Sequence, residues 1–271
     1  MEIPHLLPKL DFRLSRTWMI NNLYAHRGFH NKPSIPENSI PAFRRAIERG
    51  YGAEFDVHLI SDGSLVVFHD NNLERCTGVD GIIEDCTLPE LKELSLEGTD
   101  EKIPTFQEVL DLFKNNPGPD GKICPLIIEL KTSGGNHEAL VKAVCDVLDT
   151  YPGPYVIESF DPNAVLALRK LRPEIERGQL VDNFVKFKFD GGLSRGVKRL
   201  LQSLAFDFVT WPDFVAFRFT ARDSVGIKRA VKSNRVTNVA WTIKTPGMYK
   251  EAVKEGYIII FEGFDPAEVE I

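Results

Sequence analysis

The chain has 271 residues, of which 43% are hydrophobic and 27% are charged, and its formal net charge is -6. This length can fill one large α/β domain, and the mild acidity excludes general nucleic-acid binding, which needs a basic surface. No segment reaches the roughly 18 consecutive apolar residues of a membrane span, so we expect no stable insertion into a membrane.

The N-terminal segment lacks the order of a signal peptide, in which a basic start, an apolar run and a small-residue cleavage site follow one another. We therefore expect a cytoplasmic protein whose residues 1–22 form an arm across the fold. No linker, repeat or low-complexity tract divides the rest, so residues 23–271 are expected to form a single domain.

The four cysteines contain no CxxC pair and no nearby histidine at zinc-site spacing. We expect four reduced thiols that behave as small hydrophobic side chains. A disulfide between Cys76 and Cys86 is the alternative that the sequence leaves open.

The first predicted elements are a strand at residues 22–26 and a helix at 39–50. In the helix, Ile40, Phe43, Ala46 and Ile47 form one apolar stripe at helical spacing. Ser39 is a suitable cap, Pro41 fits the first turn, and Gly50 can end the helix.

The second strand, residues 53–57, is followed by the Asp-Gly turn of ISDGS and by LVVFHD at 65–70. The connection is too short for a parallel crossover, which needs roughly a dozen residues, so LVVFHD is predicted to return antiparallel as a hairpin. The later predicted helices are 104–116, 137–151 and 163–172, and the later predicted strands are 126–130, 155–159, 177–181, 207–211, 238–242 and 257–261.

Eight parallel strands alternating with helices predict an α/β fold, a closed (β/α)8 TIM-type barrel with the β-hairpin extension after the second strand. The competing architecture is a doubly wound open sheet. That fold normally has a glycine-rich phosphate-binding first turn, which this sequence lacks.

Candidate metal ligands lie at the predicted carboxyl ends of the barrel strands, where such barrels carry their functional side chains. Glu54 and Asp56 share one face of the second strand, and Glu129 ends another strand. Three carboxylates suit one divalent cation, Mg²⁺ or Ca²⁺, and zinc fits less well because thiolates and closely spaced histidines are missing. For Glu54 and Asp56 alone, a buried salt-bridge network with Arg27 and Lys131 is the alternative.

His26 and His69 are candidate catalytic groups, one taking a proton from a nucleophile and the other protonating a leaving alkoxide. Arg27 and Lys131 could neutralise phosphate oxygens, or could pair with the same acids. Trp241 could form an apolar wall for a substrate or pack the barrel, and the two interpretations remain open. His58 shares the face of Glu54 and Asp56, but we expect it to be supporting or exposed.

Taken together and in this order, the segments HRG, PENS, EFDVHLISDG, VVFHD, IIELK, ESFDP and WTIK resemble the glycerophosphodiester phosphodiesterase family. The resemblance runs from about residue 24 to the last strand and implies a TIM-type barrel that hydrolyses a glycerophosphodiester to glycerol phosphate and an alcohol. It also implies roles for individual residues: His26 and His69 as the acid/base pair, Glu54, Asp56 and Glu129 as metal ligands, Arg27 and Lys131 as phosphate contacts, and Glu37 and Asn38 in the turn near the site. With Trp241, the last four are the candidate substrate-binding residues.

Four positions, in three segments, depart from the family's usual pattern. Lys244 stands where the family often has Asn, Phe261 and Glu262 replace Thr-Asp, and Cys76 replaces a Thr. We expect none of them to touch the metal or histidine set, so activity should survive, with a small-molecule glycerophosphodiester as the substrate. The sequence sets neither the head group nor the oligomeric state.

Two other functions are kept as alternatives. One is a lyase of the sphingomyelinase D-like type, which would stop at a cyclic phosphate. The other is a non-catalytic barrel that binds a phosphorylated ligand, although such a binder has little need for paired proton carriers.

Overall fold

The computed structural model describes residues 17–182, 210–232 and 236–271. Its strands are β1 (Leu23–His26), β2 (Gly52–Leu59), β3 (Leu65–Val67), β4 (Leu126–Leu130), β5 (Tyr155–Ser159), β6 (Arg177–Val181), β7 (Phe214–Arg218), β8 (Thr237–Ile243) and β9 (Ile258–Phe261). Its helices are α2 (Thr17–Ile20), α3 (Ile40–Glu48), α4 (Glu74–Thr77), α5 (Leu88–Glu93), α6 (Phe106–Asn115), α7 (His137–Leu148), α8 (Pro162–Leu171), α11 (Val225–Lys232) and α12 (Pro246–Lys254). Three short 3-10 helices are η1 (Ile83–Asp85), η2 (Phe219–Ala221) and η3 (Pro266–Glu268).

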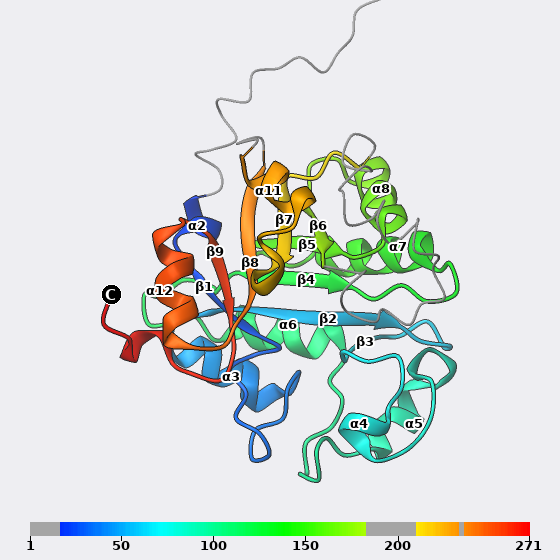
Figure 1. Ribbon diagram of the computed structural model, residues 1–271. Coiled ribbons are helices and arrows are strands. Elements are labelled where there is room, and N and C mark those ends of the chain that lie inside the picture. Colours follow the sequence, from blue (N-terminus) through cyan, green and yellow to red (C-terminus); the bar gives the residue numbers. More distant parts are fainter. Residues whose placement is uncertain (1–16, 183–209, 233–235) are drawn as a thin grey trace, which may run out of the picture.

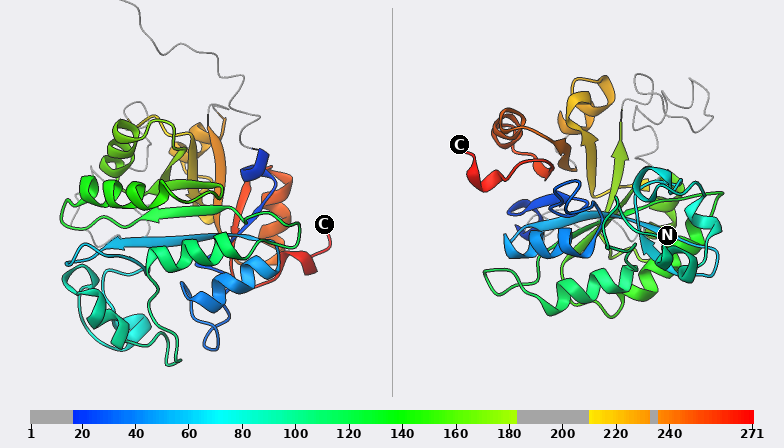
Figure 2. Two further views of the ribbon diagram at one scale, coloured as in Figure 1. Left: turned by 180° about the vertical axis from the view of Figure 1, so that it is seen from behind. Right: turned by 90° about the horizontal axis from the view of Figure 1, so that it is seen from below.

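Eight parallel strands close into a barrel in the order β1, β2, β4, β5, β6, β7, β8 and β9, and β9 pairs back onto β1. Helices surround this ring (Figure 2). The strand β3 pairs antiparallel with β2 outside the ring, with Val57 opposite Val67. The predicted TIM-type barrel with a hairpin extension after the second strand is therefore confirmed.

The prediction of one strand was wrong. A strand was expected at 207–211, but the strand at this place in the barrel is β7, which begins at Phe214. Thr210 and Trp211 lie outside any strand, and residues 207–209 fall outside the described part of the chain. Both segments are apolar runs of similar length, and a short apolar run carries no register of its own. The pairing of β7 with β6 and β8 selects the second run.

The barrel interior is filled by side chains from alternate strand positions, as expected for this architecture. Tyr24, Ile127, Val156, Phe214 and others form one buried cluster inside the ring. Met19 of α2 joins this cluster. Residues 1–16 of the predicted arm fall outside the described part of the chain.

The helix α3 has the caps that the sequence predicts. The Ser39 hydroxyl accepts a hydrogen bond from the Ala42 backbone at 3.4 Å, Pro41 lies in the first turn, and Gly50 follows the helix with φ +72°. The outer layer is a large apolar cluster in which Phe43 on α3 contacts both Phe55 on β2 and Phe113 on α6 edge to face.

A small lobe with its own apolar core continues from β3. Its helices α4 and α5 lie beside the end of β2 (Figure 1) and bury Phe68, Leu73, Ile83 and Leu91. All four cysteines, each within the described ranges, are free thiols, and no disulfide joins Cys76 to Cys86. Within the described part of the chain, no helix combines the length and the apolarity needed to cross a membrane.

Candidate active site at the barrel mouth

Three carboxylates meet at the carboxyl end of the barrel. Glu54 and Asp56 lie on β2, and Glu129 on β4 is paired in register with Asp56. Each offers an oxygen within 4.8 Å of the oxygens of the other two, and all three side chains are buried. Oxygen donors at this spacing fit a hard divalent cation.

Two cations contact these acids. The Lys131 ammonium lies 3.0 Å from Asp56 and 2.6 Å from Glu129, and the Arg27 guanidinium lies 3.7 Å from Asp56. The backbone N–H of Arg27 also donates to Glu54 at 3.2 Å. The predicted ion pairing and the predicted carboxylate cluster therefore occur together.

The three acids hold protons very differently. Burial would raise the pKa of Asp56, but Lys131 and Arg27 outweigh burial and hold it well below its usual range. Burial raises the pKa of Glu129 to about 7 despite Lys131, and burial together with the charge of Asp56 raises the pKa of Glu54 well above its usual range. Of the three acids, Asp56 is therefore the one that ionises most readily.

The loop after β1 is held in a left-handed conformation at two residues that carry side chains. Arg27 has φ +55° and Asn38 has φ +53°. The Asn38 backbone N–H donates to the Arg27 carbonyl at 2.9 Å, and its side-chain amide donates to Asp56 at 3.0 Å. Gly28 follows with φ +78°, and a Cβ there would lie 2.9 Å from Ala42, which only glycine avoids. Such conformations cost about 1–3 kcal/mol each and gather at functional sites.

His26 ends β1 beside the acids. Its Nε2 lies 3.9 Å from Glu54, and its Nδ1 is 2.8 Å from Glu262, which follows β9 and is 3.1 Å from Lys244. Burial and the charge of Arg27 lower the pKa of His26 to about 4, against the opposite effect of Glu262. A neutral ring that donates its Nδ1 proton to Glu262 has its Nε2 lone pair free to take a proton.

His69 comes from the hairpin and has a similar arrangement. Its Nδ1 pairs with Asp70, and Asp70 in turn pairs with Arg75 of the lobe. Burial and the charge of Lys131 lower the pKa of His69, while Asp56 and Asp70 oppose the change. Each histidine is therefore oriented through Nδ1 by a carboxylate that is itself held by a cation.

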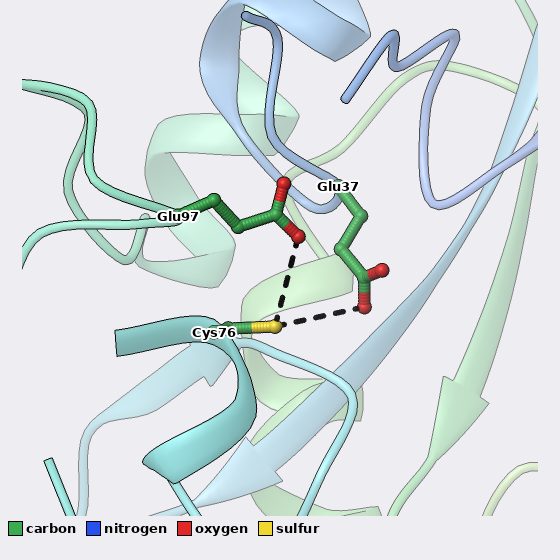
Figure 3. A group of neighbouring side chains, drawn as sticks. All are labelled: Glu37, Cys76 and Glu97. Atoms are coloured by element: carbon green, nitrogen blue, oxygen red, sulfur yellow. Dashed lines mark hydrogen bonds between the residues drawn. The ribbon is translucent and has the colours of Figure 1, made fainter. Parts of the chain in front are cut away.

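A second cluster of acidic side chains forms where Glu37, Cys76 and Glu97 meet (Figure 3). The Cys76 thiol faces the two carboxylates at 3.9 and 4.0 Å. Arg27, Arg75 and Lys32 already pair with Glu37, and Lys32 also pairs with Glu97 at 2.5 Å. Burial raises the pKa of Cys76 to about 12, so the thiol stays protonated. This cluster is an ion-pair network that joins the lobe to the barrel, and its carboxylates are already neutralised.

An aromatic and charged rim lies on β5 to β8. The Trp241 ring packs edge-on against Phe160 at 5.8 Å, and the Arg218 guanidinium lies 4.6 Å from the Trp241 ring while pairing with Asp182. Within the described residues, the Trp241 indole N–H has no hydrogen-bond partner. Trp241 therefore both packs the barrel interior and presents a donor at the mouth.

All ten residues selected from the sequence lie in or next to this mouth. The expectation that Glu262 touches none of the site residues is wrong, because only the closed barrel brings it to His26. Sequence reasoning also missed Asp70, which orients His69, and the cation Arg75. It also placed His58 as supporting or exposed, whereas His58 is fully buried and its Nδ1 lies 2.7 Å from Glu84 of the lobe. An exposed role for His58 is therefore wrong, and its contact with Glu84 is a link between barrel and lobe.

Searches of known proteins find relatives of this chain. A glycerophosphodiester phosphodiesterase of Caldanaerobacter subterraneus is 35% identical over 167 residues, which is 58% of this chain and 65% of that protein. A lysophospholipase D of Homo sapiens is 33% identical over 157 residues, or 53% of this chain and 46% of the human protein. The matched segment thus spans less than two thirds of the length of either relative.

Among solved structures, a phosphodiesterase of Oleispira antarctica in complex with the product sn-glycerol-3-phosphate superimposes with a TM-score of 0.71 at 26% identity. The match covers 89% of this chain and 92% of the Oleispira chain. The glycerophosphoryl diester phosphodiesterase family model matches residues 26–261, nearly the whole barrel. The chain belongs to the glycerophosphoryl diester phosphodiesterase family.

Proposed function

We propose that this protein hydrolyses glycerophosphodiesters to glycerol phosphate and an alcohol, with one divalent cation, Mg²⁺ or Ca²⁺, and with His26 and His69 as the proton-transfer groups. The observation that carries the proposal is the meeting of three buried carboxylates with two histidines at one barrel mouth. The named relative with bound sn-glycerol-3-phosphate supports this choice of substrate class.

Glu54, Asp56 and Glu129 would hold the cation, because three carboxylates with oxygens within 4.8 Å match the donor set of Mg²⁺ or Ca²⁺. When bound, such a cation polarises a phosphoryl oxygen and lowers the pKa of a coordinated hydroxyl. Arg27 and Lys131 add positive charge for the remaining phosphate oxygens, while staying in contact with Asp56.

The proton transfers fall to the two rings. One histidine takes a proton at Nε2 from the attacking water, or from a neighbouring substrate hydroxyl, as the new P–O bond forms, and the other gives a proton to the leaving alkoxide as the old P–O bond breaks. If the substrate hydroxyl attacks, water then opens the cyclic phosphate to give glycerol phosphate. The low pKa of His26 keeps that ring neutral near pH 7, as a base requires. A phosphodiester anion in the mouth favours protonation of the partner ring, because it adds negative charge there.

The test is release of glycerol phosphate from glycerophosphocholine and glycerophosphoethanolamine, with chelator, Mg²⁺ and Ca²⁺ in parallel. We expect release that stops with chelator and returns with one of the two metals. Lysophosphatidylcholine is included because one relative is a lysophospholipase D. Release only from the lysolipid would show that the substrate is a lysophospholipid and not a deacylated glycerophosphodiester. No release from any of the three substrates would overturn the proposal.

Phosphorus NMR of the products separates hydrolysis from the sphingomyelinase D-like alternative. Hydrolysis predicts a phosphate monoester as the final signal. A cyclic phosphate that persists after the substrate is consumed would favour the lyase, and ligand binding without turnover would favour the non-catalytic barrel.

A further inference from the structure

Glu158 is a fourth buried carboxylate at the barrel mouth. It lies on β5 directly opposite Glu129 of β4 in the parallel register. Val156, two residues earlier, packs inside the barrel with Ile127, which is two residues before Glu129. Because strand side chains alternate between faces, Glu158 points into the barrel at the same level as Glu129.

Glu158 differs from its neighbours because it has no partner. Its side chain is 1% exposed, and within the described residues neither carboxylate oxygen has a hydrogen-bond donor. By contrast, Glu54 accepts from the Arg27 backbone, and Asp56 and Glu129 contact Lys131. A buried polar group without a partner is costly, and protonation would remove the charge but leave the hydroxyl and carbonyl unpaired. The chain therefore keeps a destabilising group at this position.

Charge balance indicates what could offset this cost. The four inward carboxylates carry -4 when ionised, and Arg27 and Lys131, the two cations in contact with them, carry +2. Because Arg27 also pairs with Glu37, the ionised carboxylates exceed these cations by at least two charges, an excess that a divalent cation would reduce. Glu158 is the register partner of Glu129, one of the proposed ligands, and burial, followed by the neighbouring charges of Glu129 and Asp56, raises the pKa of Glu158.

We propose that Glu158 is a fourth carboxylate of the cation site and increases the site's affinity for Mg²⁺ or Ca²⁺, either on the ion or on its bound water. This inference rests on the proposed function, in which Glu54, Asp56 and Glu129 hold the ion. Packing inside the barrel does not explain a carboxylate at this position, whereas cation binding does.

The test is calorimetric titration of the full chain with MgCl₂ and CaCl₂ at one fixed neutral pH, for the unaltered protein and for Glu158→Gln. The amide keeps the size of the side chain and removes its charge. We expect affinity to fall roughly 10- to 100-fold, as for other groups that support metal ligands. Glu158→Asp keeps the charge and should lose less affinity than Glu158→Gln. Glu48→Gln, an exposed change on α3, should leave the affinity unaltered.

Thermal unfolding without added metal gives the second readout. A carboxylate kept for cation binding and not for stability should leave Glu158→Gln equally stable or more stable. Equal affinity in Glu158→Gln, or a metal-free variant that is less stable or fails to fold, would overturn the inference.

Glu129→Gln separates this inference from the proposed function. Binding that is abolished by Glu129→Gln but unchanged by Glu158→Gln would leave the three-ligand site standing and remove Glu158 from it. No cation binding by the unaltered protein would overturn both.

Discussion

Glu37→Gln tests the ion-pair network that holds the loop after β1 to the lobe. Glu37 is 5% exposed, and it accepts hydrogen bonds from Arg27 at 2.7 Å and from Arg75 at 2.6 and 3.1 Å, and also pairs with Lys32. Removing one partner of a buried ion pair costs about 3–5 kcal/mol, because the other charge stays buried. Arg75 and Lys32 are 42% and 36% exposed and can turn to water, so Arg27 accounts for most of the loss.

We therefore expect Glu37→Gln to lower the free energy of unfolding by about 3 kcal/mol, the lower end, because the amide oxygen still accepts from Arg27. For a chain of this size this corresponds to a fall in Tm of roughly 6–12 °C. Urea and thermal unfolding followed by circular dichroism measure both values. The control Glu48→Gln should remain within about 0.5 kcal/mol of the unaltered protein. A loss below about 1 kcal/mol for Glu37→Gln would show that the network adds little stability.

The loss of stability in Glu37→Gln should depend on pH. Burial would raise the pKa of Glu37, but the hydrogen bond from Arg75 and the charge of Arg27 hold it far below its usual range. A carboxyl group with a depressed pKa in the folded state contributes its full stability above its unfolded pKa of about 4.3 and loses it as the pH falls further. The stability difference between the two proteins should hence be constant above about pH 5 and shrink below about pH 4.3. A difference that grows in acid would contradict this assignment.

The remaining predictions concern the histidine partners and the barrel interior. Glu262→Gln should lower kcat roughly 10- to 100-fold with little change in KM, because it leaves His26 in place but poorly oriented; an equal rise in KM would indicate damage to substrate binding instead. Asp70→Asn should have the same effect through His69, and steady-state kinetics check both. Gly178→Ala should cost roughly 3 kcal/mol or more in urea unfolding, because its Cβ would lie 2.1 Å from the Phe214 ring. Gly247→Ala within α12, whose Cβ would meet nothing nearer than the Thr245 hydroxyl at 3.9 Å, is its control and should be neutral or slightly stabilising.

Local sequence patterns were enough to predict the barrel and the three acids. The spacing of Glu54 and Asp56 fixes one face of a strand, and the short Asp-Gly turn requires the antiparallel return that brings His69 to the mouth. Capping at Ser39 and Gly50 is local as well. These features depend on residues within a few positions of one another, which is why a single sequence specifies them.

Contacts between distant segments could not be predicted in the same way. Glu262 lies 236 residues from His26, and Arg75 lies 38 residues from Glu37, so only the closed barrel brings them together. Glu158 was within reach of sequence reasoning, since it alternates with Val156 on a predicted strand, but a lone acid in an apolar run gives no sign of its missing partner. The choice between residues 207–211 and 214–218 as a strand likewise depends on pairing with neighbours.

The central claim is that two histidines carry out the proton transfers beside a carboxylate-held cation. Its most direct test is single-turnover kinetics of His26→Ala and His69→Ala with glycerophosphocholine, using proteins whose circular dichroism and cation affinity match those of the unaltered chain. We expect each variant to lose roughly 10²- to 10⁴-fold in the rate of glycerol phosphate formation. Full activity in either variant would contradict the two-histidine mechanism.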